Sequence, residues 1–155
     1  MKRLYKEKEV KDEWIERFEK NKSAYRIHAD RNFFINFRNS PYIQKIVEYT
    51  KLRGDEVVLE PGCGSGKFSV TLATFGCEVV SLDCSDEMLV NTEQSKMQAE
   101  EYFGKLKIIT QKGGITNLGF KDDTFDLVVN DGSKDREEKK RIKKRISELR
   151  EIGKV

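Results

Sequence analysis

The chain has 155 residues, of which 37% are charged and 37% apolar, and its formal net charge is +3. This length indicates one domain with a sizeable core, and the small net charge gives no argument for a nucleic-acid partner. We expect no membrane span and no signal peptide, because no long apolar run is present. Three cysteines without a Cys-x-x-Cys pair favour free thiols in a reducing cytoplasm, and a single histidine argues against zinc.

Residues 1–53 are predicted to form a helical segment that could cover a ligand site. Trp14 and Phe18 lie one turn apart in a short amphipathic helix over residues 11–20. A stretch rich in aromatic and basic side chains follows, and Pro41 favours the start of a helix that runs to residue 50. This segment therefore precedes the core without specifying a substrate.

Residues 54–132 are predicted to form the core, and residues 133–155 a basic amphipathic helix. Apolar runs and helical spacing predict strands at 57–60, 78–83, 106–110 and 125–130, and helices at 67–75, 86–103 and 134–152. Their alternation predicts an α/β fold with a parallel sheet and right-handed crossovers. The last segment holds ten Lys/Arg against five Asp/Glu, which favours a solvated helix face and leaves an RNA-facing surface as an alternative.

The strongest functional signal is the loop after the first strand, which reads Glu60-Pro61-Gly62-Cys63-Gly64-Ser65-Gly66. Glycine at alternate positions lets the backbone come very close to a ligand. A phosphate-binding P-loop does not fit, because Phe68 stands where that motif needs Ser or Thr. The dinucleotide motif G-x-G-x-x-G fits poorly, because the third glycine comes one residue early; an NAD-binding enzyme stays a distant alternative.

An acidic residue ends the second strand. Asp83 follows Glu60 by 23 positions, near the spacing at which an acid reaches a ribose diol. A carboxylate accepts two hydrogen bonds from such a diol, although a helix-start role is the plainer alternative. Ser85 is predicted to cap the next helix, with Met88 three positions on. Cys84 and Met88 either pack in the core or line an adenine face.

The pattern E-x-G-x-G-x-G from Glu60 resembles the first motif of the class I S-adenosylmethionine-dependent methyltransferases, in their type 11/25-like domain. Residues 85–89 resemble the family's S-x-x-M-L helix start, and residues 115–130 resemble the block that leads into its fourth strand. The resemblance implies a Rossmann-like, doubly wound parallel sheet and S-adenosylmethionine as cofactor. It also implies methyl transfer to a small-molecule acceptor, with nucleic acid not favoured, and no metal.

The resemblance implies these cofactor-binding residues: Glu60, Gly62, Cys63, Gly64, Gly66, Asp83, Cys84, Met88, Gly114, Ile115 and Asn130. The family's acid that pairs with the adenine amino group would fall at Gly114, so only the Ile115 N–H is left to meet the ring there. Asn130 and Asp131 are candidates beside the reacting methyl, and no residue stands out as a general base. Tyr25 and Arg31 are candidates to bind the cofactor carboxylate, and His28 is most simply a surface residue.

Only four of the family's seven strands are found, so the sheet is expected to be incomplete, as if cut after the fourth strand. The fourth strand reads as buried on both faces, and an open edge there invites pairing. A truncated gene, a homodimer through this edge, or a helix folded over it would each account for that pattern. The competing hypothesis for function is a degenerate, non-catalytic module that binds S-adenosylmethionine weakly or not at all.

Overall fold

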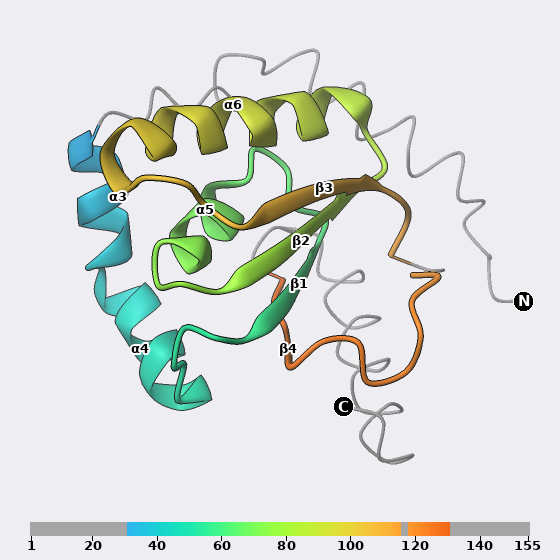
Figure 1. The fold of residues 1–155 in the computed structure, drawn as a ribbon, viewed down its shortest axis with the longest axis horizontal. Helices are drawn as coiled ribbons and strands as arrows, with labels where there is room; N and C mark the ends of the chain where they lie inside the picture. The colour runs from blue at the N-terminus through green and yellow to red at the C-terminus, as the bar shows by residue number, and fades with distance from the viewer. Residues whose placement is uncertain (1–30, 116–117, 131–155) are drawn as a thin grey trace, which may run out of the picture.

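The computed structural model describes residues 31–115 and 118–130, shown in colour in Figure 1. Its elements are α3 (Arg31–Arg38), α4 (Pro41–Thr50), β1 (Val57–Pro61), α5 (Lys67–Ala73), β2 (Glu78–Asp83), α6 (Asp86–Phe103), β3 (Ile108–Lys112) and β4 (Leu127–Val128). The predicted bounds of the second strand and of the helix after it are confirmed. The predicted helix 11–20, the C-terminal helix, Tyr25, His28 and Asp131 lie outside the described residues.

The four strands form one parallel sheet in the order β3-β2-β1-β4. This arrangement confirms the predicted parallel α/β fold, and Figure 1 shows the central place of β1 and β2. The two crossovers through α5 and α6 step in the same direction across the sheet. Right-handed connections then place both helices on one face, where they contact each other and β2.

β1 runs one residue further than predicted and α5 ends two residues earlier, while β3 and β4 differ more from their predicted bounds. β4 has only two residues, both partly exposed, where residues 125–130 were expected as a strand buried on both faces. Just before β4, Asp126 bonds Val57 twice: its N–H donates to the Val57 carbonyl at 2.9 Å, and its side chain accepts from the Val57 N–H at 2.8 Å. β3 begins two residues late, because the N–H of Leu106 bonds the Glu100 side chain at 2.9 Å.

The core lies between the sheet and its helices. Val58, Val79 and Ile108 project from three neighbouring strands into one apolar cluster with the buried residues of α5. Val58 and Val79 are fully buried, as are Val70 and Leu72 of α5. Burial of this kind stabilises a domain by roughly 1.5–3 kcal/mol per large aliphatic side chain. This cluster holds α5 and the glycine loop before it against the sheet.

The N-terminal helices pack on the outer side of α5. Phe34 is 1% exposed and meets Phe103 of α6 edge to face, with 6.4 Å between the ring centroids. The Lys67 ammonium lies 4.0 Å from the centroid of the Phe37 ring. Arg38 donates to the hydroxyl of Thr74 at 3.2 Å. These contacts tie α3 to the helix that follows the glycine loop.

Helix α4 begins as the sequence predicts. Ser40 is its N-cap, and its hydroxyl oxygen accepts a hydrogen bond from the N–H of Ile43 at 3.4 Å. Pro41 takes the first helical position, where its missing N–H costs nothing. The connection from β3 to β4 contains no helix in its described residues, 113–115 and 118–126.

The described residues hold no helix that is long and apolar enough to cross a membrane. The domain limits at residues 53 and 132, the homodimer through β4 and the cytoplasmic location stay predictions. β4 does lie at an edge of the described sheet, with Leu127 and Val128 partly exposed. Sedimentation of the purified chain would test whether a second copy covers that edge.

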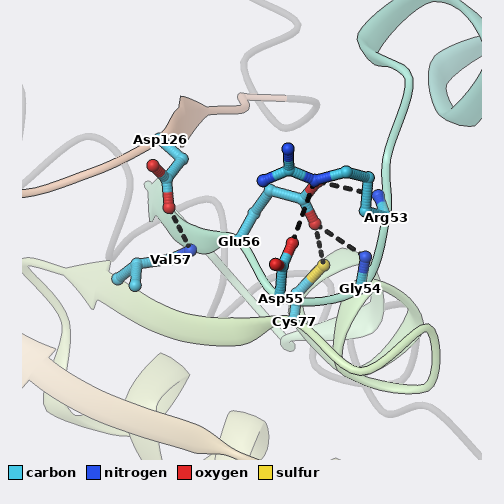
Figure 2. Close-up of polar contacts among 7 residues, drawn as sticks. All are labelled: Arg53, Gly54, Asp55, Glu56, Val57, Cys77 and Asp126. Atoms are coloured by element: carbon cyan, nitrogen blue, oxygen red, sulfur yellow. Dashed lines mark hydrogen bonds and ion pairs between the residues drawn. The ribbon is translucent and has the colours of Figure 1, made fainter.

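A buried carboxylate fixes the amino end of β1, as Figure 2 shows. Glu56 is 9% exposed and accepts hydrogen bonds from the N–H groups of Arg53 at 2.7 Å and Gly54 at 2.8 Å. The thiol of Cys77 also donates to it, over 3.8 Å. Burial alone would raise the pKa of Glu56, but the backbone hydrogen bonds and the Arg53 guanidinium outweigh it, so this pKa is lowered. Burial beside Glu56 raises the pKa of Cys77 to about 11.

Replacing Glu56 by Gln should weaken this junction. An amide side chain has a single acceptor atom, so one of the two backbone N–H groups loses its partner, at a cost of about 1–3 kcal/mol. Because the pKa of Glu56 is lowered on folding, its contribution is present above the unfolded pKa and is lost as the pH falls through the folded value. Urea unfolding should therefore show a stability gap at pH 7 that narrows in acid.

The matched control is Asp55→Asn. The Asp55 carboxylate pairs with Arg53 at 3.1 Å, but both side chains are more than 70% exposed. An exposed ion pair is worth less than about 1 kcal/mol. Equal losses from the two variants would contradict the role assigned to Glu56.

Candidate functional site

The glycine loop and Asp83 meet at the carboxyl ends of β1 and β2. Oδ2 of Asp83 accepts a hydrogen bond from the N–H of Gly64 at 3.0 Å. The carbonyl oxygen of Leu82 accepts two more from the loop, from Gly62 at 2.7 Å and from Cys63 at 3.0 Å. Parallel sheets bind ligands at this end of their strands. The loop is therefore anchored to β2 at the position where a ligand is expected.

The three glycines of the loop differ in what surrounds them. Gly62, Gly64 and Gly66 all adopt positive φ, at +73°, +56° and +74°. A Cβ on Gly66 would lie 2.6 Å from Cγ2 of Thr92, so packing against α6 excludes a side chain there. A Cβ on Gly64 would meet nothing within 4 Å. That open side of Gly64 is the direction from which a ligand can reach the backbone.

Asp83 supports the loop with both carboxylate oxygens. Oδ1 accepts a hydrogen bond from the N–H of Ser85 at 2.9 Å, while Oδ2 accepts the one from Gly64. Burial raises the pKa of this carboxyl, although the hydrogen bonds from Ser85 and Gly64 lower it in part. Cys84 also lowers it, through its N–H and its thiol, so the carboxylate already has donors from Gly64, Cys84 and Ser85. The helix-start role is therefore confirmed, and the ligand role stays a prediction.

Glu60 lies beneath the loop rather than in solvent. Its side chain is 3% exposed and accepts a hydrogen bond from the hydroxyl of Ser69 in α5. Ser69 in turn accepts one from the hydroxyl of Ser81 in β2, at 2.6 Å. This chain of hydroxyls fixes the buried carboxylate between β1, α5 and β2. Glu60 is therefore a buried group and not a solvated carboxylate at the end of a strand.

The candidate sulfur side chains are mostly buried. Cys63 is 6% exposed, and its Sγ lies 3.4 Å from the hydroxyl oxygen of Thr92. Burial, with the nearby Glu60 and Asp83 carboxylates, raises the pKa of Cys63 far above that of an ordinary thiol. Its thiol is therefore neutral and no nucleophile. Met88 is 8% exposed in the first turn of α6, and Cys84 is half-buried beside Asp83.

The side chains of Ile115 and Asn130 lie close to Gly62 at the carboxyl end of β1. A Cβ on Gly62 would lie 3.5 Å from Cδ1 of Ile115 and 3.6 Å from Nδ2 of Asn130. The same amide nitrogen donates to the carbonyl oxygen of Pro61 at 2.5 Å. Asn130 thus holds the end of β1 in place, and Gly114 lies next to Ile115 after β3. Arg31 is exposed at the start of α3.

Two site residues escaped the sequence analysis. The hydroxyl of Thr92 donates to the carbonyl oxygen of Gly64 at 3.0 Å, and the hydroxyl of Ser95 donates to that of Ser65 at 2.8 Å. Both lie on the buried face of α6, whose members are Met88, Thr92, Ser95 and Ala99. Polar residues at core-facing helical positions were the signal that could have found them.

The sheet order, the glycine loop after β1 and the acid that ends β2 together define a class I S-adenosylmethionine-dependent methyltransferase fold. Residues 58–153 match the sequence model of a family described as a methyltransferase domain. The chain belongs to this family, which confirms the resemblance seen in its motifs.

Curated relatives match over the same core. The chain is 37% identical over 84 residues to a malonyl-[acyl-carrier protein] O-methyltransferase from Erwinia billingiae, covering 54% of this chain and 30% of that protein. It is 41% identical over 59 residues to an uncharacterized protein from Haemophilus influenzae, covering 38% of this chain and 22% of the relative. The matched stretch thus spans less than a third of either relative's length.

A solved structure agrees with the fold. It comes from Galdieria sulphuraria, and its suggested activity is that of a sarcosine dimethylglycine methyltransferase. The two chains superpose with a TM-score of 0.51 at 18% identity, covering 61% of this chain and 35% of the other. At this identity the likeness supports the architecture alone.

Gly64→Ala tests the open side of the loop. A Cβ at Gly64 fills space that is empty in the protein, so the fold should persist with a loss of about 1–2 kcal/mol from the positive φ. Affinity for S-adenosylhomocysteine should fall at least tenfold in calorimetric titration. Gly104→Ala is the control, because Gly104 also has positive φ and open space but ends α6. Equal affinity in both variants would show that no ligand approaches Gly64.

Proposed function

We propose that this chain binds S-adenosylmethionine and transfers its methyl group to a small-molecule acceptor. The observation that carries the proposal is the hydrogen bond between Asp83 and Gly64, which joins the acid after β2 to the glycine loop after β1. Membership of the methyltransferase domain family supports the same reading. A nucleic-acid acceptor is not favoured, since the chain's net charge is only +3.

The residues present fit such a cofactor. The carboxylate of Asp83 is an acceptor-only group that would suit the two hydroxyls of a ribose, and the open side of Gly64 admits close approach to the backbone. The apolar side chains of Met88 and Ile115 flank these groups in the same part of the fold and would face the adenine. Gly114 offers no side-chain acceptor, so the ring would be met there by the N–H of Ile115.

The chemistry that the cofactor supplies when bound is a methyl group already activated by a positive sulfur. The protein then has to align the acceptor with that methyl, which is worth several kcal/mol without any covalent step. Asn130 would line the site near the reacting methyl group, since its amide contacts Pro61 and lies beside Gly62. Cys63 has no part as a nucleophile because its buried thiol is neutral. No metal is proposed.

Calorimetric titration of the purified chain with S-adenosylhomocysteine tests the proposal. Micromolar affinity with one site per chain is expected, and NADH should not bind. A folded chain that binds neither compound would overturn the proposal and favour the non-catalytic alternative. Where binding is found, transfer of tritiated methyl groups from S-adenosylmethionine to a panel of small acceptors tests the catalytic step.

Asp83→Asn should cut affinity for S-adenosylhomocysteine at least tenfold, or about 1.4 kcal/mol, because the ribose loses an ionised acceptor. Burial raises the pKa of Asp83, so wild-type affinity should be flat near neutral pH and fall as acid protonates the carboxyl. The variant should show no such fall. The stability of the unliganded chain should change with pH in the opposite direction. Because the pKa of Asp83 is raised on folding, its contribution to stability is full below the unfolded pKa and is lost as the pH rises through the folded pKa.

Asp86→Asn provides the matched control three residues further on. Its carboxylate is exposed and pairs with Lys112 at 2.5 Å, away from the loop. The Asp86→Asn variant should bind S-adenosylhomocysteine as tightly as the wild type at every pH. If the Asp83→Asn variant loses affinity in acid as the wild type does, Asp83 is not part of the binding site.

A further inference from the structure

The glycine loop is held from behind by two hydroxyl groups of α6. Thr92 donates to the carbonyl oxygen of Gly64 at 3.0 Å, and Ser95 donates to the carbonyl oxygen of Ser65 at 2.8 Å. Thr92 is fully buried, and Ser95 is 3% exposed. Two successive loop carbonyls therefore point toward α6, although the residues that bind them lie about 30 positions away in the sequence.

This arrangement decides where the loop's N–H groups point. The carbonyl of Gly64 and the N–H of Ser65 belong to one planar trans peptide unit, so they point in opposite directions. With the carbonyl turned toward Thr92, the Ser65 N–H points away from α6. That N–H donates to no backbone carbonyl among the described residues. It is thus a donor fixed in direction on the side of the loop that α6 leaves open.

We propose that Thr92 is a positioning residue that aims the Ser65 N–H at the amino-acid end of the bound cofactor, while Ser95 holds the next peptide unit, whose N–H on Gly66 bonds the Cys63 carbonyl. The inference rests on the proposed function, because it assumes that S-adenosylmethionine occupies the loop. The α-carboxylate is the acceptor that suits such a donor, since hydrogen bonds to ionised oxygens are about twice as strong as neutral ones. Without the Thr92 hydroxyl, the Gly64 carbonyl keeps only the weak contact with the Cys63 thiol, so the direction of the Ser65 N–H is less firmly fixed.

The shape of Thr92 has a separate role that the test must keep apart. Its side chain occupies the space beside Gly66, where a Cβ would lie 2.6 Å from Cγ2. Thr92→Val keeps this shape and removes the hydroxyl, whereas Thr92→Ser keeps the hydroxyl and removes the methyl group. Comparing the two variants separates hydrogen bonding from packing.

The control for a lost buried hydroxyl is Thr71→Val. Thr71 is 1% exposed, and its hydroxyl donates to the Lys67 carbonyl within α5 at 2.8 Å. The substitution and the burial match those of Thr92, but no loop carbonyl is involved. Thermal unfolding of both Val variants shows how much stability each hydroxyl contributes.

The experiment titrates each variant with two ligands, S-adenosylhomocysteine and 5′-methylthioadenosine. The second ligand keeps the adenosine and the sulfur but lacks the amino and carboxylate groups. Thr92→Val should bind S-adenosylhomocysteine about tenfold more weakly and 5′-methylthioadenosine within twofold of the wild type. Thr92→Ser should restore the affinity for S-adenosylhomocysteine, and Thr71→Val should leave both affinities unchanged.

Other outcomes overturn the inference. If Thr92→Val loses the same affinity for both ligands, the hydroxyl only stabilises the loop. If it loses affinity for neither, the hydroxyl does not direct the Ser65 N–H. If Thr92→Val does not fold, Ser95→Ala takes its place, with a smaller ligand-selective loss expected, because Ser95 fixes the peptide unit on the other side of Ser65. A wild-type chain that binds neither ligand contradicts the proposed function itself, so the two failures are distinguishable.

Discussion

The hydrogen bond from Gly64 to Asp83 joins the two parts of the sequence on which the site depends. It links the loop after β1 to the end of β2, over a separation of 19 residues. The two bonds from the loop to Leu82 lie directly beside it. Because β1 and β2 are parallel neighbours, their carboxyl ends lie side by side, and the acid reaches the loop without distortion. The loop is thus fixed to the carboxyl end of the sheet and is not a free connection.

Strand β1 is secured at both of its ends by different chemistry. At its amino end, Glu56 satisfies the backbone that leads into the strand, as Figure 2 shows. At its carboxyl end, Asp83, Thr92 and Ser95 satisfy the backbone that leaves it. Buried carboxylates and hydroxyls are stable here because each meets a donor or acceptor. The functional loop is therefore carried by a rigid scaffold, which is the usual arrangement for binding sites.

The sequence predicted the elements whose ends are encoded locally. β2 and α6 have the expected bounds because Ser85 caps the helix with its own hydroxyl and Gly104 ends it. The positions of Gly62, Gly64, Gly66 and Asp83 in the site also followed, since the loop's spacing after a strand is a local pattern. The family resemblance added the cofactor and the class of reaction.

What the sequence did not reveal depends on pairing between distant residues. Before β4, the side chain of Asp126 bonds the N–H of Val57, 69 residues away. The amide of Asn130 bonds the carbonyl of Pro61, again 69 residues distant, and its expected place near the reacting methyl stays a prediction. Thr92 and Ser95 looked like ordinary helix residues in the sequence, because their hydroxyls bond backbone carbonyls of the distant glycine loop. Such contacts become visible only once the strands are in register.

The most direct test is a crystal structure of the chain with S-adenosylhomocysteine. The account predicts both ribose hydroxyls within hydrogen-bonding distance of the Asp83 carboxylate, while Oδ2 keeps its bond to the N–H of Gly64. It also predicts the ligand on the open side of Gly64. A ligand bound elsewhere, or an Asp83 side chain turned away from the ribose, would contradict the central claim that one carboxylate serves both the loop and the cofactor.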